Sequence, residues 1–240
     1  MNILKIATLT LGLGSMLAMT SCGEEDVEPT LFTVTIENVS QPNTVMSERA
    51  GGAVPLSPPV WAQYEGSNPM FDLGGKANLG TERIAEDGFA TEMLALLGND
   101  EDVINKSVET SEGGPDEGPA LFPGESVTFS FTADEEDEFQ FMTMFVQSND
   151  WFISVGEDGL ELFSDGRPIN GDITSRLRLY DAGTEVDTPA GSGPHQKPVQ
   201  GPDDVDFGDK EDEDIAAASE RHPDYVIPNL SDVIKVTISN

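Results

Sequence analysis

Apolar and polar residues alternate along several short stretches of this chain, which is the pattern of strands with one buried face. In residues 31–39 every second residue from Phe32 to Ile36 is apolar, and the intervening residues are threonines. Residues 124–132 alternate in the same way, whereas residues 139–146 are almost entirely apolar and predict a central strand. We expect these last two stretches to pair with each other as an antiparallel hairpin across the acidic turn between them.

The second half of the chain holds more strand-like runs, separated by long polar segments. The predicted strands there are residues 151–155, 160–163, 176–180 and 233–239. Residues 99–118 and 186–214 are predicted loops, and the proline- and glycine-rich residues 40–72 predict either a long ordered loop or several short extended pieces. One helical pattern occurs, at residues 81–98, and Gly88 divides it because glycine is unfavourable inside helices. Together these elements predict an all-β fold, an antiparallel β-sandwich of about eight strands with one short helical region.

The chain carries a very large negative charge, which limits the kinds of molecule that it can bind. Twelve lysines and arginines face 45 aspartates and glutamates, which gives a formal net charge of −33. Nucleic acids are excluded as partners, because proteins bind them by neutralising phosphates with basic side chains. Adhesion to anionic lipids through a basic patch is excluded for the same reason. The balance instead favours solubility and the binding of cations.

The N-terminus has the layout of an export signal. A short start with one lysine precedes an apolar run that is too short to span a membrane, and Thr20, Ser21 and Cys22 follow it. This triplet resembles a bacterial lipobox, which implies a diacylglyceryl thioether on Cys22 and a lipid-anchored protein of the cell envelope, at the outer membrane or cell surface. We therefore expect a lipoprotein signal peptide at residues 1–21, an acidic tether at 22–30 and a single domain at 31–240. A plain signal peptide with an incidental cysteine is the alternative.

Most familiar catalytic motifs are missing from the sequence. His195 and His222 are far apart and form no zinc-type pair, and neither a Gly-x-Ser-x-Gly elbow nor a phosphate-binding loop occurs. A pair of carboxylates for glycoside hydrolysis stays possible, since 45 acids allow many spacings. The sequence therefore favours a protein that is not an enzyme.

Three acids stand out by their position at the ends of predicted strands. Asp150 directly precedes the run Trp-Phe-Ile-Ser-Val, while Asp181 and Glu185 follow the run Arg-Leu-Arg-Leu-Tyr. If the two runs lie side by side, these carboxylates converge at one edge of a sheet. Carboxylates on loops are the ligands that a hard cation such as calcium prefers, so we expect a calcium site there.

The same stretches resemble a known family. The sequence Ser-Asn-Asp-Trp-Phe-Ile-Ser-Val-Gly at residues 148–156, followed by Leu-Tyr-Asp-Ala-Gly-Thr-Glu at 179–185, resembles the spondin N-terminal domain. The resemblance implies a β-sandwich with a structural calcium ion held by loop carboxylates, with Asp150, Asp181 and Glu185 at the matching positions. It also implies adhesion or receptor contact rather than catalysis.

Taken together, the sequence predicts a secreted, lipid-anchored, calcium-binding β-sandwich for extracellular adhesion or ligand recognition. Its partner would be an extracellular protein or a glycan. Two alternatives stay open: an envelope hydrolase that acts on glycans through paired carboxylates, and a purely structural envelope protein.

Overall fold

The computed structural model describes residues 28–110, 118–201 and 204–240. The expected signal peptide and the lipidation site at Cys22 lie outside these residues, as does most of the expected acidic tether. Within the described residues, no helix combines the length and the apolar character that crossing a membrane requires.

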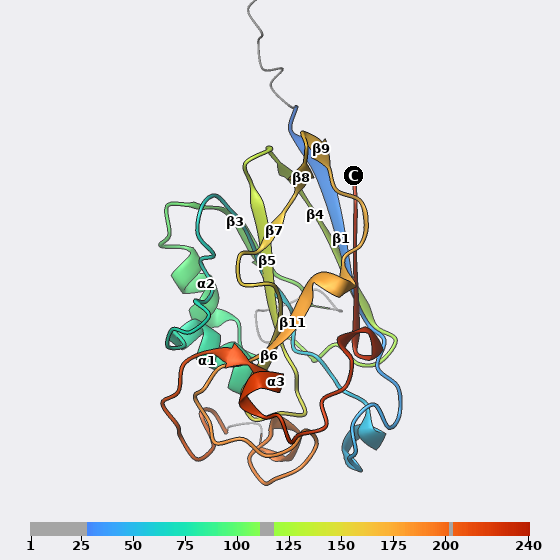
Figure 1. The fold of residues 1–240 in the computed structure, drawn as a ribbon, viewed down its shortest axis with the longest axis vertical. Coiled ribbons are helices and arrows are strands. Elements are labelled where there is room, and N and C mark those ends of the chain that lie inside the picture. Colours follow the sequence, from blue (N-terminus) through green and yellow to red (C-terminus); the bar gives the residue numbers. More distant parts are fainter. Residues whose placement is uncertain (1–27, 111–117, 202–203) are drawn as a thin grey trace, which may run out of the picture.

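Two antiparallel sheets form the body of the molecule (Figure 1). The smaller sheet has the order β10-β13-β1-β4, with β1 Thr30–Asn38, β4 Ser126–Ala133, β10 Gly171–Asp172 and β13 Ile234–Ser239. The larger sheet has the order β12-β11-β6-β5-β2-β3, with β7 beside β5. Its strands are β2 Val60–Tyr64, β3 Val103–Val108, β5 Glu138–Met144, β6 Trp151–Val155, β7 Leu160–Glu161, β11 Leu177–Asp181 and β12 Ala216–Ala217. A separate hairpin pairs β8 Phe163–Ser164 with β9 Arg167–Pro168.

The helices are few and short. They are α1 Leu79–Asp87, α2 Thr91–Leu97 and α3 Ala218–Arg221, with 3-10 turns η1 Arg49–Gly52, η2 Thr174–Arg176, η3 Lys197–Val199 and η4 Leu230–Asp232. Eight of the strands in the described part of the chain are five residues or longer. The predicted all-β, antiparallel sandwich-like fold is therefore confirmed.

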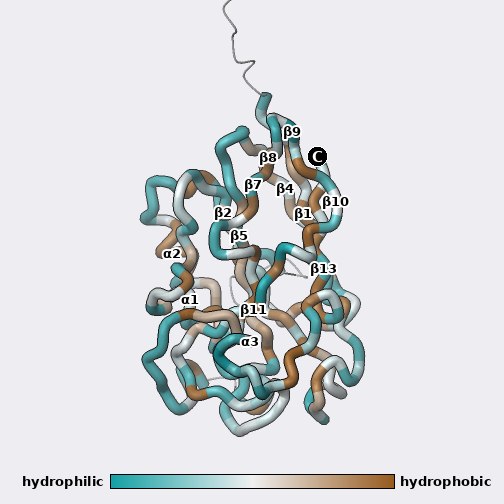
Figure 2. Tube along the Cα trace, viewed as in Figure 1, coloured by the Kyte–Doolittle hydropathy of each residue, from teal (hydrophilic) through white to brown (hydrophobic). Residues whose placement is uncertain are grey.

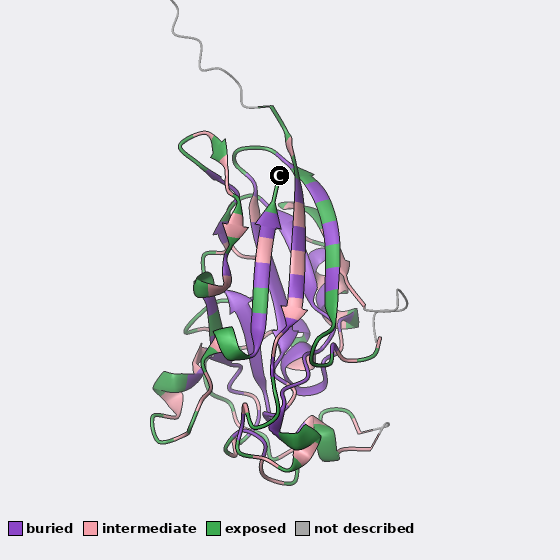
Figure 3. Ribbon diagram, turned by 90° about the vertical axis from the view of Figure 1, so that its right-hand side faces the viewer, coloured by how far each residue is buried: buried purple, intermediate pink, exposed green. Residues whose placement is uncertain are grey.

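The main core lies between the two sheets. Along β1 and β4 buried residues alternate with more exposed ones, which is visible as banding of the strands in Figure 3. Trp61 of β2 stacks on Phe129 of β4 with ring centroids 4.8 Å apart, and Phe131 stacks on Phe139 of β5 at 5.6 Å. Figure 2 shows the hydrophobic residues concentrated along the strands and the hydrophilic residues in the loops around them. Burial of these aromatic rings between the sheets supplies much of the driving force for folding.

A second apolar cluster joins the helices to the outer face of the larger sheet. Ile84 of α1 and Met93 of α2 are buried against side chains of β2, β5, β6 and β11. The two helices are separated at Gly88, whose φ of 75° ends α1 in the left-handed conformation that glycine adopts without strain. Because this layer covers β5 and β6 from outside, both faces of these strands are buried, as their apolar sequences require.

Two expectations about individual strands are wrong. Strand β3 lies within residues 99–118, which were expected to form a loop, whereas β2 is a short extended piece within residues 40–72, one of the two forms expected for that segment. The predicted hairpin of residues 124–132 with 139–146 does not form either, because β4 pairs with β1 while β5 pairs with β2, β6 and β7. The acidic turn between β4 and β5 therefore crosses from one sheet to the other. This crossing lets the apolar faces of both strands meet in the core, where Phe131 stacks on Phe139.

Candidate metal centre

The two acid-tipped runs are neighbours in the larger sheet. Strands β6 and β11 are antiparallel, and their register pairs Trp151 with Asp181. The pairing continues one step further, since the N–H of Ala182 donates to the carbonyl oxygen of Asp150 at 3.1 Å. Asp150, just before β6, and Asp181, at the end of β11, therefore lie at the same edge of the sheet, and both are fully buried.

Only one carboxylate oxygen of Asp150 accepts hydrogen bonds. Its Oδ2 accepts the backbone N–H groups of Thr184 at 2.7 Å and Glu185 at 3.1 Å, and the hydroxyl of Thr184 at 3.2 Å. Its Oδ1 is buried and has no hydrogen-bond partner. Burial raises the pKa of Asp150 to about 7, and the negative charge of Asp181 adds to this rise against the opposing hydrogen bonds.

Asp181 has partners on both oxygens. Its Oδ1 accepts the N–H of Gly183 at 2.8 Å and lies 3.1 Å from Nε of Arg221 in α3. Its Oδ2 lies 2.8 Å from Nε2 of His222, the residue that follows α3. Asp181 thus connects the end of β11 to α3 through two basic side chains.

Two residues of this cluster were not predicted from the sequence. Asp187 places its Oδ2 2.6 Å from Nε2 of His222, and the same oxygen accepts the indole N–H of Trp151 at 2.8 Å. Its Oδ1 is buried without a partner. Burial, together with the negative charges of Asp150 and Asp181, raises the pKa of Asp187 to about 10. We call Asp150, Asp181, Asp187 and His222 the carboxylate cluster.

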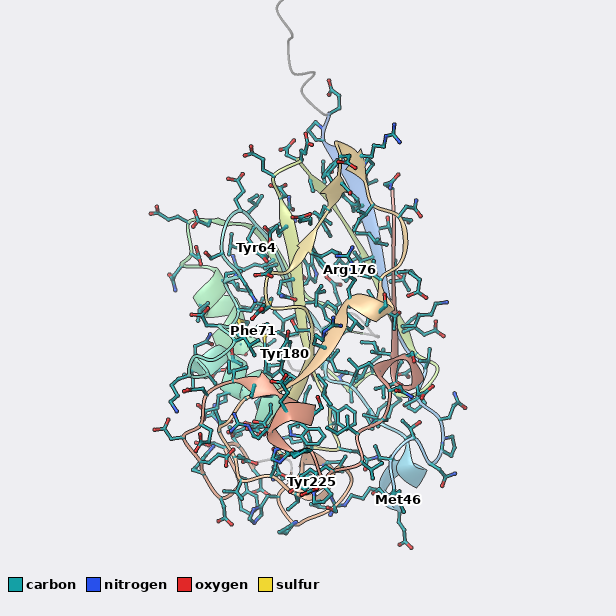
Figure 4. All side chains as sticks on the ribbon, in the orientation of Figure 1. Met46, Tyr64, Phe71, Arg176, Tyr180 and Tyr225 are labelled. Atoms are coloured by element: carbon teal, nitrogen blue, oxygen red, sulfur yellow. The ribbon has the colours of Figure 1, made fainter. Side chains whose placement is uncertain are left out.

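Aromatic rings fix the position of the histidine. The ring of His222 stacks on that of Tyr225, with centroids 4.6 Å apart and an interplanar angle of 9°. The centroid of the Trp151 ring lies 5.9 Å from that of the imidazole. The hydroxyl of Tyr225 donates to the carbonyl oxygen of Asp187 at 3.2 Å. Figure 4 places Tyr225 among the loops beyond the end of β11. The imidazole therefore has little freedom to leave the two carboxylates.

Glu185 contributes to the cluster through its backbone, as a donor to Asp150. Its fully buried side chain accepts only a long hydrogen bond, 3.4 Å, from the amide of Asn149, and its Oε1 has no partner. Burial raises the pKa of Glu185 to about 8, and the charge of Glu86 adds more to this rise than that of Asp150. The structure therefore brings Asp150 and Asp181 together with Asp187, whereas the carboxylate of Glu185 lies beside the amide of Asn149.

The carboxylate cluster contains the donor atoms that a divalent cation needs. One oxygen each of Asp181 and Asp187 and one ring nitrogen of His222 lie within 4.8 Å of one another. A second group with the same spacing, Glu82, Glu86 and Asp206, already has a cation of the protein. Nζ of Lys210 lies 2.9 Å from both carboxylate oxygens of Glu86 and 3.6 Å from Glu82. The carboxylate cluster is therefore the better candidate for a metal.

No model of a known protein family matches the chain, and a search of curated proteins finds none that is similar to it. The functional assignment must accordingly come from the geometry of the carboxylate cluster and from the sequence patterns that led to it.

Proposed function

We propose that the protein is a calcium-binding recognition protein of the cell envelope, in which Asp150, Asp181 and Asp187 hold the ion at one end of the sandwich. The observation that supports this most directly is the pair of buried, unpartnered oxygens, Oδ1 of Asp150 and Oδ1 of Asp187. A buried polar atom without a partner costs free energy, and a bound cation removes that cost.

The balance of charges in the cluster also favours a bound cation. Three buried carboxylates lie beside only two basic side chains, those of Arg221 and His222. A cation at the cluster would replace mutual repulsion between the carboxylates by attraction. Calcium suits the site because it prefers carboxylate oxygens, and His222 would then serve as a hydrogen-bond donor to two of the ligands.

The role of the ion would be to hold the loops in one arrangement. The segment after β11 supplies Asp187, and the segment after α3 supplies His222, so an ion at the cluster ties both to the start of β6. Loops fixed in this way form a preorganised surface, which lowers the entropy that a partner loses on binding. The resemblance to spondin domains agrees with this role and stays a prediction, as does the lipid anchor at Cys22.

The burial of the acids favours binding over glycan hydrolysis. A general acid has to reach hydrogen-bonding distance of the glycosidic oxygen. Asp150 and Asp181 are both 0% exposed and closed in by the chain that follows β11. A glycan could reach them only after these loops had opened.

A thermal melt of the full-length protein in chelator and in 10 mM calcium tests the proposal. With a dissociation constant on the order of 10⁻⁴–10⁻³ M, calcium should stabilise the fold by roughly 1–3 kcal/mol, or about 3–10 °C in Tm. Magnesium serves as the matched control, because its small size demands a stricter octahedral geometry. Manganese and zinc would show whether His222 itself acts as a ligand. Identical melting curves in chelator and in every metal would refute the proposal.

A further inference from the structure

Five of the eleven lysines and arginines that the structure describes form ion pairs with acids. Within the described residues, ion pairs with carboxylates are made by Lys76, Arg83, Lys197, Lys210 and Arg221. Arg167 and Arg176 differ, because neither guanidinium has an ion pair or a side-chain hydrogen bond with any residue that the structure describes. Arg49 and Arg178 also have no acidic partner, but their guanidiniums donate hydrogen bonds to Gln196 and to backbone carbonyl oxygens respectively, so among the described arginines only Arg167 and Arg176 have neither kind of partner.

Both arginines line the same cavity, which we call the arginine pocket. It has a volume of about 370 Å³, within the usual range for small-molecule sites. Its floor is apolar and includes the buried side chains of Leu160 and Ile173. Its rim is polar, with the exposed side chains of Ser164, Asn170 and Ser175 beside the two guanidiniums.

A tight hairpin fixes the position of Arg167. Strands β8 and β9 pair Ser164 with Arg167 across the two residues Asp165 and Gly166, whose φ angles are 52° and 69°. Positive φ at both central residues is the mark of a type I′ turn, the favoured geometry for a two-residue hairpin. The hairpin is extended by the N–H of Ile169, which donates to the carbonyl oxygen of Leu162 at 2.9 Å. Ser164 and Arg167 are thus held side by side on the rim.

The opposite wall is tied to the smaller sheet. Strand β10 pairs with β13, and the hydroxyl of Thr174 accepts the N–H of Val236 at 3.0 Å. Arg176 follows directly in η2, and its N–H donates to the carbonyl oxygen of Ile173 at 2.8 Å. The single acid that lines the pocket is Asp172, and its Oδ1 already accepts the N–H of Thr174 at 2.9 Å. Both guanidiniums consequently stay available to a ligand.

We propose that the arginine pocket binds a carboxylated sugar, namely a uronic acid unit of an acidic glycan. The planar guanidinium matches a carboxylate with two parallel hydrogen bonds, so Arg167 and Arg176 would hold the acid group. The hydroxyls of Ser164 and Ser175 and the amide of Asn170 would bind ring hydroxyls, while Leu160 and Ile173 lie beneath the apolar face of the ring.

The net charge of −33 adds a second argument about the ligand. An anion is repelled by this protein at long range, so the pocket can bind one only through short, directional contacts. A bare oxyanion offers such contacts to the arginines alone, whereas a uronic acid also engages the hydroxyl groups and the apolar floor. The proposal names the ligand of the recognition role proposed above and rests on it, but its residues are separate from the carboxylate cluster. The two sites lie at opposite ends of β11 (Figure 1), and Figure 4 shows Arg176 near the start of this strand.

Titration of the full-length protein with glucuronic acid, followed by NMR chemical shifts, tests this proposal. We expect binding that weakens about tenfold or more in Arg167→Gln and in Arg176→Gln, the loss that follows from removing a charged hydrogen-bonding pair. Arg167→Lys keeps the charge but loses the planar fork, and should give an intermediate loss. Lys106→Gln in β3 is the matched control, because it changes the net charge equally at an edge strand of the larger sheet whose residues do not line the pocket.

Glucose and inorganic sulfate separate the contributions of the ring and of the charge. Glucose should bind at least about tenfold more weakly than glucuronic acid, and sulfate more weakly as well. The proposal is overturned if glucose or sulfate binds as tightly as glucuronic acid, or if the glutamine variants bind like the parent. Repeating the titration in chelator distinguishes the two proposals: glucuronic acid binding that persists while calcium fails to raise Tm overturns only the calcium site.

Discussion

The Nε2 atom of His222 lies 2.6 Å from the Oδ2 atom of Asp187, although the two residues are 35 positions apart in the chain. This contact occupies one oxygen of Asp187 and leaves Oδ1 buried without a partner, next to Asp150, whose Oδ1 is in the same state. Two buried carboxylate oxygens without partners require either protons or a cation. The predictions about the cluster follow from this alternative.

Asp187→Asn should produce two effects of opposite sign. Without metal, the variant should melt at the same temperature as the parent or higher, because burial and the charges of Asp150 and Asp181 keep the Asp187 carboxyl protonated, and the amide replaces one neutral group by another of similar shape. With calcium, most of the rise in Tm should disappear, because a ligand is lost. Differential scanning calorimetry in chelator and in 10 mM calcium measures both effects. Asp224→Asn, an exposed neighbour, is the matched control and should keep the full calcium effect; full retention in Asp187→Asn would place the ion elsewhere.

The metal-free protein should lose stability as the pH rises from 5 to 7. Folded Asp150 holds its proton to about pH 7, whereas an unfolded aspartate loses it near pH 4. Between these values the folded state binds more protons than the unfolded state, so the free energy of unfolding falls by up to about 1.4 kcal/mol per pH unit from this group.

Urea unfolding in chelator at several pH values, for the parent and for Asp150→Asn, isolates this contribution. The variant should show a shallower fall with pH, since it has no proton to lose at this position. Calcium should flatten the fall in the parent, because the ion binds the deprotonated carboxylate. Parallel pH profiles for the two proteins would contradict the assignment.

The strands that could be predicted from the sequence are those whose pattern of apolar and polar residues reflects which of their faces are buried. The alternation around Val34 reflects one face in the core and one toward solvent, and the apolar run around Phe141 reflects a strand covered on both sides. Strand β2 could be expected only as an unplaced extended piece within residues 40–72, because all five of its residues are buried and show no alternation, and prolines precede it. Strand β3 was missed because it is a polar edge strand whose partners lie on one side only.

Only those members of the carboxylate cluster that flank predicted strands could be predicted from the sequence. Asp150 and Asp181 flank two strands that pair in the sheet, so their approach followed from recognising the strands. Asp187 lies six residues beyond Asp181 in the loop that follows the same strand, so its closeness to the strand end was only a weak indication that it joins the cluster. His222 had none, because only the return of the chain through α3 brings it to Asp181, 41 residues away.

A methyl group at residue 208 should disturb the neighbourhood of Glu185. A Cβ on Gly208 would lie 2.3 Å from Oε1 and 2.4 Å from Cδ of Glu185, so this fully buried carboxylate would have to shift within its packed surroundings. Gly208→Ala should therefore lower the free energy of unfolding by about 1–3 kcal/mol, the usual cost of overpacking. Gly156→Ala is the control, because a Cβ there meets no atom within 4 Å. Urea denaturation that gives equal stabilities for the two variants would contradict the close packing of Glu185.

Removal of the ammonium of Lys210 should leave the buried carboxylate of Glu86 without its main cation. Glu86 is 1% exposed, and both its oxygens lie 2.9 Å from Nζ of Lys210. Breaking a buried pair costs about 3–5 kcal/mol, and since the Lys210 side chain is 42% exposed we expect a smaller loss, about 2 kcal/mol, for Lys210→Met. Adding Glu86→Gln to this variant should restore more than half of that loss, because the unpaired charge is then gone. Lys76→Met removes an ion pair of comparable length between exposed side chains and should change stability little. A double-mutant cycle, measured by urea unfolding, gives the coupling energy between Lys210 and Glu86. Equal losses of stability for Lys210→Met and Lys76→Met, or no recovery in the double variant, would show that the Lys210–Glu86 pair does not hold the loop containing Lys210 onto α1.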